Sequence, residues 1–503
     1  MFAKHLIKEF ALVVWLIWCL VCSCRTAGTV PDQITLCGIL FIYSTYLFAR
    51  SLSDKRLVVG SIAIAGCIQA IVAILQSFSL VDVNHDVFTI TGLLGNPGQL
   101  GGFQSVALVC AVSFLHSVRE IRWVVILLCV VTLILVSLVL SDSRAGILAA
   151  IMGSLVLSYD FWIKYLSKHK LLWLLGCGLF VLLTLLLYSC RPESAESRFL
   201  VWRVCLNMFA DKPIAGFGIW GFNHNYMLYQ GEYLLSHQDH TMYFRADNVA
   251  YPYNEAIRIL VEQGLVGFIL VCTVFAINIK GAKEKRDIAA LISLVVFSMF
   301  SYPSYKVSLV LLFPLLLGTL SSLPFKTNEG RKAFSVVSFG IAVICIAFIG
   351  AAERHFMHKV SQVYENGYVE NDEINRLFVR NKNCIDINAS YSTLIKHIPE
   401  FLNQDTVPLI FPSSDNWCVL GDYYLSNGNL NEAERYFIQA SHMTPGLVIP
   451  KYSLWKTYNM QMKKKESQCV AGQILKMSVK VENTLTLRLR NEVLNYDYSS
   501  FEK

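Results

Sequence analysis

Long apolar runs follow one another along most of this sequence, and each is long enough to cross a lipid bilayer as a helix. A helix of roughly 17–25 apolar residues spans a hydrocarbon core about 30 Å thick. The chain contains about eleven such runs, near residues 10–27, 33–50, 57–80, 100–117, 122–140, 144–162, 171–189, 254–279, 287–303, 307–323 and 334–352. Only 16% of the 503 residues are charged, against about 25% in soluble domains. The pattern predicts a polytopic membrane protein of the all-α class and excludes a soluble enzyme.

Lys and Arg residues gather in alternate connections between these runs. Short basic loops mark the cytoplasmic side of a membrane protein. The basic connections contain Lys4 and Lys8; Arg50, Lys55 and Arg56; Arg119 and Arg122; Lys164, Lys168 and Lys170; Lys280, Lys283, Lys285 and Arg286; and Lys326, Arg331 and Lys332. With an odd number of spans, this alternation predicts a cytoplasmic amino terminus and a carboxy terminus on the outer side of the bacterial inner membrane. The formal net charge of +7 follows from this topology, so we expect membrane lipids and no nucleic acid as partners.

The composition changes near residue 353, after which the chain has the character of an ordinary globular sequence. We therefore predict a membrane domain at 1–352, with an outer loop at 190–253, and an outer helical domain at 353–503. The outer domain contains the pattern W-x2-LG-x2-Y from Trp417, continued by Gly428, Ala433, Phe437, Ala440 and Pro445. These are the spacings of a tetratricopeptide repeat, a helix–turn–helix unit of about 34 residues that stacks on neighbouring helices. Such a repeat can dock a protein partner.

Most of the fifteen cysteines lie in or beside apolar runs. Cys384, Cys418 and Cys469 fall in the outer domain, where a disulfide is chemically permitted, and their pairing stays open. The sequence has no His/Cys spacing typical of zinc, so we expect no metal and no cofactor.

The outer loop is too long for a simple connector, because typical connections run to about six residues. Its segment 196–210 has helical periodicity, with an apolar side formed by Phe199, Val201, Trp202, Cys205, Leu206 and Phe209. We expect an amphipathic helix on the membrane face, with Arg198 and Arg203 pointing away from the apolar side. There they would bind either anionic lipid or a substrate. The next segment, DKPIAGFGIWGF, is rich in turn-forming residues.

Two glycine-containing segments on the outer side could meet a phosphate. In TGLLGNPGQLGGF (91–103), backbone N–H groups could face the anion, although a plain loop turn explains the glycines equally well. In SDSRAG (141–146), Arg144 begins a helix. Its guanidinium either extends to lipid head groups or holds a phosphate in a two-point contact.

The segment ADNVAYPYNEAIRILVEQGLVG (246–267) brings polar groups to the point where the loop re-enters the membrane. They are Asp247, Asn248, Tyr253, Asn254, Glu255, Arg258 and Glu262. Capping by Glu255 and an i, i+4 ion pair between Arg258 and Glu262 account for part of this set. Polar groups at membrane depth are costly and tend to be functional, so the remainder makes this segment the main candidate site.

Several segments together resemble the O-antigen ligase and polymerase superfamily of glycosyltransferases, which act on lipid-linked glycans. They are SDSRAG; the loop helix followed by DKPIAGFGIWGF; PYNEAIRILVEQGLVG; and SYPSYKVSLVLLFPLLLG (301–318). The resemblance covers residues 35–325 and implies a membrane-embedded enzyme of the GT-C type. Its substrates would be a glycan on undecaprenyl pyrophosphate and an acceptor lipid, glycan or protein at the outer face, with no metal and no nucleotide sugar. A bundle with a tetratricopeptide-like tail resembles the members found in Bacteroidetes.

By this resemblance, Arg144, Arg198 and Arg203 stand where the family binds pyrophosphate, and Tyr253 stands where its ligases carry a proposed histidine base. Tyrosine, with a reference pKa near 10, is a poor base. Glu255, a loop histidine (His224, His237 or His240) or no base at all would then serve. The predicted catalytic residues are Arg144, Arg203, Tyr253, Asn254 and Glu255, and the predicted substrate-binding residues are Arg198, Arg245, Asp247, Asn248 and Arg258.

Glycan ligation is the leading hypothesis, and other functions compete with it. A repeat-unit polymerase would use a second lipid-linked glycan as the acceptor, and a protein O-oligosaccharyltransferase would use a protein. A transporter also needs many spans and intramembrane charges, but here the charges gather at one face and no inverted repeat is visible. A scaffold that only displays the outer domain has no need of arginines on the loop.

Overall fold

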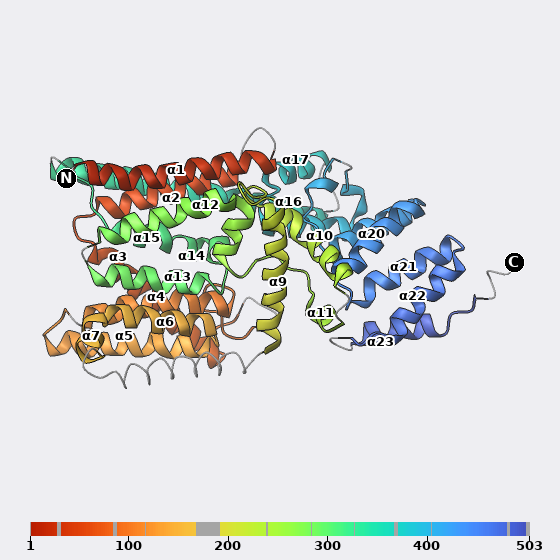
Figure 1. Ribbon diagram of the computed structural model, residues 1–503, viewed down its shortest axis with the longest axis horizontal. Helices are drawn as coiled ribbons and strands as arrows, with labels where there is room; N and C mark the ends of the chain where they lie inside the picture. The colour runs from red at the N-terminus through yellow and green to blue at the C-terminus, as the bar shows by residue number, and fades with distance from the viewer. Residues whose placement is uncertain are drawn as a thin grey trace.

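The computed structural model describes residues 2–27, 32–83, 88–115, 117–166, 192–237, 240–282, 284–325, 327–366, 371–403, 405–479 and 483–498. Every regular element in these ranges is helical, which confirms the all-α class. Figure 1 shows a bundle of long helices and, at one end of it, a group of shorter helices from the carboxy-terminal part of the chain. Helix α9 (Pro192–Asp211) lies across that end of the bundle, between the two groups.

Seven helices in the described ranges are long and apolar enough to cross a membrane, in agreement with seven of the expected spans. They are α1 (Phe2–Ala27), α2 (Gln33–Ser51), α3 (Arg56–Ser77), α4 (Pro97–Leu115), α5 (Ile121–Leu140), α12 (Glu255–Lys280) and α16 (Asn328–Asn366).

Three further expected spans are shorter than the sequence suggested. The run at 144–162 is α6 (Arg144–Leu157) followed by α7 (Tyr159–Leu166), and the run at 287–303 is α13 (Lys285–Ser298). The run at 307–323 is divided between α14 (Val307–Val310) and α15 (Leu312–Thr319), after a 3-10 turn, η1 (Pro303–Tyr305). The remaining run, at 171–189, lies outside the described residues.

Helix α4 forms the centre of the bundle, and all its residues from Gln99 to Ala111 are buried. Glycines let its neighbours approach closely. A Cβ on Gly102 would lie 2.2 Å from the Phe297 ring of α13, and a Cβ on Gly66 of α3 would lie 2.3 Å from the Ala107 Cβ of α4. Helix α5 is different, because large apolar side chains such as Trp123 stay exposed along it, as expected of a helix that faces lipid.

The basic connections meet at the end of the bundle opposite the carboxy-terminal helices (Figure 1). The Nζ of Lys8 donates a hydrogen bond to the carbonyl oxygen of Asn278 at 3.4 Å. The buried Arg50 pairs with Glu9 at 2.8 Å, and Lys285 pairs with Asp160. The described basic connections, which alternate along the sequence, therefore lie together at one end of the folded bundle.

A break in α12 anchors the loop segment DKPIAGFG. Gly264 has φ +66° and leaves the helix open for one turn. The loop backbone fills the gap: Phe217 N and Gly218 N donate to the carbonyls of residues 261 and 262 at 2.8 Å, and Leu265 N donates to the carbonyl of residue 213 at 2.8 Å. A Cβ on Gly264 would lie 2.3 Å from the carbonyl oxygen of Ile214. The glycines of this segment therefore serve a backbone-to-backbone contact.

The carboxy-terminal helices form a separate stack joined to the bundle by α16, which runs unbroken through the predicted boundary at 352/353. They are α17 (Asn371–Asn381), α18 (Ile385–His397), η2 (Pro399–Phe401), η3 (Val407–Leu409), α19 (Ser414–Ser426), α20 (Leu430–Met443), α21 (Val448–Met460), α22 (Lys464–Lys476) and α23 (Thr484–Leu494). Gly421 of α19 lies directly over the Phe437 ring of α20. Cys384, Cys418 and Cys469 are unpaired.

Candidate functional site

A cavity of about 450 Å³ lies at the end of the bundle that faces α9. Segments far apart in the sequence line it. They are residues 88–90, 96–98, 140–145, Arg198, Tyr253, Phe297 and 300–302. The structure thus brings together both glycine-containing segments, one arginine of the loop helix and the tyrosine of PYNEAIRIL.

Two helices begin at the wall of this cavity. The first turn of α4 starts at Pro97 and that of α6 starts at Arg144, where Ser143 caps the helix by accepting from the Gly146 N–H at 3.2 Å. A Cβ on Gly146 would lie 2.5 Å from the carbonyl oxygen of Gly101, so only glycine permits the two first turns to touch. Since helix N-termini carry partial positive charge and free N–H groups, a pair of them favours an anion.

The guanidinium groups of Arg144 and Arg198 add two full positive charges to the same wall. Arg198 Nη1 donates to the Phe300 carbonyl oxygen at 3.0 Å, and its Cζ lies 5.3 Å from the centre of the Tyr253 ring. Burial lowers the pKa of the Arg198 guanidinium, Tyr253 opposes this effect, and the nearby charge of Arg144 adds to it. Two cations that disfavour each other at one cavity favour a bound anion.

Tyrosine rings form the side of the cavity nearest the loop. The rings of Tyr251 and Tyr302 are stacked, with centroids 4.0 Å apart, and Tyr253 meets Tyr302 edge-on at 5.5 Å. The indole N–H of Trp202 on α9 donates to the carbonyl oxygen of Pro252 at 3.0 Å and holds this segment in place. Burial raises the pKa of both Tyr253 and Tyr302, so both phenols are neutral hydrogen-bonding groups near pH 7.

Glu255 and Arg258 do not line this cavity. Arg258 lies between two carboxylates, with Nε 2.6 Å from Glu255 and Nη1 2.7 Å from Glu262. Its Cζ also lies 5.8 Å from the centre of the Tyr305 ring. Asn254 caps α12 by accepting from the Ile257 N–H at 3.0 Å. These predicted site residues form a buried ion cluster at the start of α12.

The other predicted residues lie on α9 or in the segment 245–248. Arg203 is exposed on α9, and Arg245 pairs with Glu196 at 2.5 Å. Asp247 is exposed, and its carbonyl oxygen accepts from Gln230 at 3.1 Å. Asn248 donates to Asp415 at the start of α19 at 2.9 Å. None of the four lines the cavity.

The candidate histidines also lie elsewhere. His224 contacts Asn383 at 3.1 Å, and His237 stacks on Tyr233 with ring centroids 4.2 Å apart. Neither lines the cavity. The side chain of His240 lies outside the described part of the chain.

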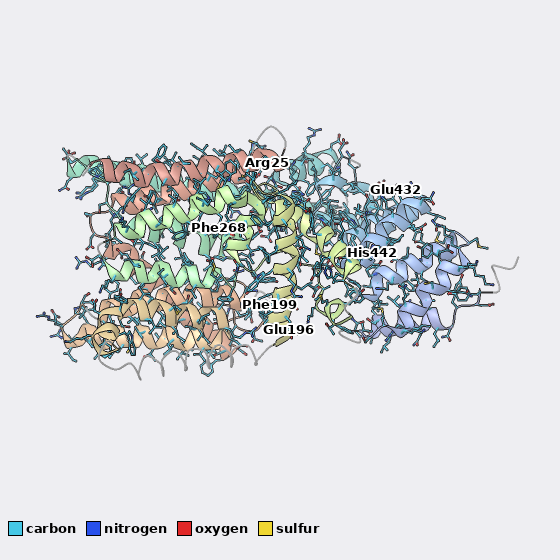
Figure 2. All side chains as sticks on the ribbon, in the orientation of Figure 1. Arg25, Glu196, Phe199, Phe268, Glu432 and His442 are labelled. Carbon is cyan, nitrogen blue, oxygen red and sulfur yellow. The ribbon has the colours of Figure 1, made fainter. Side chains whose placement is uncertain are left out.

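The loop helix presents a different face from the one the sequence suggested. Its buried face is formed by Leu200, Val201, Val204, Cys205 and Met208, whereas Phe199 and Leu206 are 48% and 51% exposed. Figure 2 shows Phe199 and Glu196 near the amino-terminal end of α9. The helix turns this buried face inward because it packs on α10 (Gly221–Ser236) and α12 as well as on the bundle end.

Two residues of the cavity that can act chemically were not singled out from the sequence. Asp142 is the only carboxylate among its described lining residues, and Tyr302 comes from the SYPSY segment. Asp142 stands in the SDSRAG segment and has the unusual φ of +50°. The signals for Tyr302 were its place in the resembling segment at 301–318 and its position beside a proline at the end of an apolar run.

Comparison with known proteins gives one match. Residues 128–272 match the family described as O-antigen ligase. No curated protein and no solved structure matches the chain. The matched segment supplies Asp142, Arg144, Arg198 and Tyr253 to the cavity. Over residues 128–272, the chain is therefore similar to the O-antigen ligase family.

Proposed function

We propose that this protein transfers a glycan from a polyprenyl pyrophosphate, undecaprenyl pyrophosphate in bacteria, to a hydroxyl group of an acceptor in the cavity beside Arg144 and Arg198. The carrying observation is the convergence of two guanidinium groups and two helix N-termini on one cavity of about 450 Å³. A pyrophosphate has the charge and the oxygen geometry that such a wall binds.

In the proposed reaction, the acceptor oxygen forms a bond with the anomeric carbon of the glycan while the bond from that carbon to the pyrophosphate oxygen breaks. Negative charge grows on the leaving oxygen, where fixed guanidinium groups stabilise it. The hydroxyl proton must go to a nearby acceptor. Asp142 is among the described lining residues of the cavity and Glu255 is not, so we assign this role to Asp142.

The proposed topology follows from the basic end of the bundle. By the positive-inside rule, this end faces the cytoplasm of the inner membrane, and the cavity and the carboxy-terminal helices face outward. We also propose that residues 1–352 form the membrane domain and that 353–503 form an outer domain with a tetratricopeptide-like helix pair at α19 and α20. A reporter fused after residue 360 should be active only on the outer side, and cytoplasmic activity would contradict this orientation.

The transfer proposal is tested by single substitutions in membranes that contain a labelled lipid-linked glycan and the acceptor fraction. We expect Arg144→Ala and Arg198→Ala each to lower the rate about 10²–10³-fold, and the Lys variants to recover only part of it, because an ammonium cannot make a two-point contact. Arg203→Ala is the matched control on α9 and should keep near-normal transfer. Normal rates in both Ala variants of the cavity would contradict the proposal.

A deletion strain separates the ligase from the polymerase. Accumulated lipid-linked polymer with an unmodified acceptor is expected for the ligase that we propose. Loss of long chains with a single repeat unit retained on the acceptor would instead identify a polymerase.

A further inference from the structure

A second, larger cavity lies between the loop and the carboxy-terminal helices. Its volume is about 890 Å³, within the range of about 300–1,000 Å³ common for ligand sites. One wall comes from the end of α10 and from α11 (His240–Arg245), and the other comes from α20, α21 and α22. We call it the outer groove. In Figure 2, His442 marks the junction of these walls.

The walls of the outer groove are held together by close backbone contacts. A Cβ on Gly446 would lie 2.8 Å from the Tyr243 carbonyl oxygen, and one on Gly231 would lie 3.4 Å from backbone atoms of residues 442 and 443. Gln230 is fully buried, and its amide donates to the carbonyl oxygens of Met443 at 2.7 Å and Asp247 at 3.1 Å. These contacts fix the two walls of the outer groove relative to each other.

The charges around the outer groove have one sign. Lys451, Lys476 and the titratable His442 line it, whereas no Asp or Glu is among its described lining residues. The Nζ of Lys451 donates to the carbonyl oxygen of Pro445 at 2.5 Å, and burial lowers the pKa of this amine to about 8. A half-buried ammonium that lacks a carboxylate among the lining residues is costly, and a bound anion would offset this cost.

The remaining lining groups suit a sugar chain. The rings of Tyr243 and Phe244 offer apolar faces, and the side chains of Gln468 and Gln473 offer planar amides. Aromatic faces cover the C–H side of a pyranose ring, and amides pair with its hydroxyls in both the donor and the acceptor sense. A peptide strand would need a row of unpaired backbone groups, and most of the described lining residues of the outer groove lie in helices.

We propose that the outer groove binds an acidic saccharide, a chain with uronic acid units that belongs to the donor or acceptor glycan. This inference rests on the proposed glycan transfer. The polypeptide links the two cavities directly, because it passes from Phe244 in the outer groove to Tyr253 in the cavity beside Arg144 and Arg198. A glycan bound in the outer groove would therefore lie beside the start of the segment 246–253, whose other end reaches the cavity beside Arg144 and Arg198.

The test measures binding to the full-length protein in lipid nanodiscs. Hexagalacturonate is the probe, and maltohexaose and hexaglutamate are the comparison ligands. We expect hexagalacturonate to bind at least about tenfold more tightly than either. The double variant Lys451→Gln/Lys476→Gln should lose about tenfold in affinity for hexagalacturonate. Phe244→Ala should lower the affinity for both hexagalacturonate and maltohexaose. Lys465→Gln, at an exposed position of α22 outside the outer groove, is the matched control and should bind normally.

The outcomes separate this inference from the proposed reaction. Arg198→Ala should lose transfer and still bind hexagalacturonate as the wild type does. Binding of the probe by a protein that shows no glycan transfer would overturn the proposed function and leave the outer groove supported. Unchanged affinity in the double Lys variant, or no binding by the wild type, would overturn the inference. Equal binding of hexaglutamate would overturn it in favour of an acidic protein partner.

Discussion

Glu255 accepts hydrogen bonds from both the backbone N–H and the side-chain hydroxyl of Ser304. Its Oε1 accepts from Ser304 Oγ at 2.5 Å and from Ser304 N at 3.1 Å, while Oε2 accepts from Arg258. The contact joins the start of α12 to the segment that carries Tyr302 into the cavity. We therefore expect Glu255 to act as a positioning residue that affects the proposed site through Tyr302.

Glu255→Gln should weaken the protein and its activity together. The change leaves Arg258 with one carboxylate partner in a buried setting, where breaking such a pair costs about 3–5 kcal/mol. We expect a lower Tm in detergent and slower transfer, with the pH profile unchanged in shape. Ser304→Ala removes one hydrogen bond worth about 1 kcal/mol, so its rate should fall about fivefold. A Glu255→Gln protein of normal Tm whose pH dependence is abolished would make Glu255 the proton acceptor.

Asp142→Asn should remove the proposed proton acceptor with little change in side-chain volume. General-base groups contribute typically about 10²–10⁴-fold in rate, so we expect a loss of this size with little change in the KM for the lipid-linked donor. Transfer rates measured against pH in membranes provide the test. A wild-type rate in Asp142→Asn would show that the hydroxyl needs no base at this position.

Tyr253→Phe should lose less than about tenfold, the size of one or two neutral hydrogen bonds. Because burial raises the pKa of this phenol, its neutral form persists as pH rises through the working range, and its titration cannot shape the rate profile there. Tyr253→His should be tolerated. A dead Tyr253→Phe enzyme with an active Asp142→Asn would reverse these roles.

Gly264→Ala should destabilise the bundle. The position combines φ +66° with a Cβ that would lie 2.3 Å from a backbone oxygen. The φ alone costs on the order of 1–3 kcal/mol, and the overlap adds to it by expelling the loop from the break in α12. Gly428→Ala is the control, since it has φ +74° with nothing within 4 Å. Thermal unfolding in detergent should show a larger fall in Tm for Gly264→Ala, and equal falls would contradict the proposed wedge.

Asn248→Asp should loosen the carboxy-terminal helices from the loop. Asn248 donates to Asp415 at 2.9 Å, so a second carboxylate there would create repulsion. Burial already raises the pKa of Asp415, and the repulsion should fade as pH falls and a proton is shared. Hydrogen exchange in α19 measures the effect, and adding Asp415→Asn should restore protection. Unaltered exchange in the single variant would show that other contacts hold the helices.

The sequence alone determined the helical class, most of the spans and the charge alternation, and it named three residues that line the cavity, Arg144, Arg198 and Tyr253. Hydropathy and loop charge can be read from short stretches of sequence, because the bilayer acts on each stretch directly. Tertiary structure decided which loop arginine lines the cavity. Arg198 and Arg203 are five residues apart, about 140° around a helix, and only the packing of α9 on α10 and α12 decides which one faces the bundle. The same holds for Glu255, whose partner Ser304 lies beyond the whole of α12 and α13. A local pattern cannot reveal such a pairing, because the two groups meet only once the helices between them have packed.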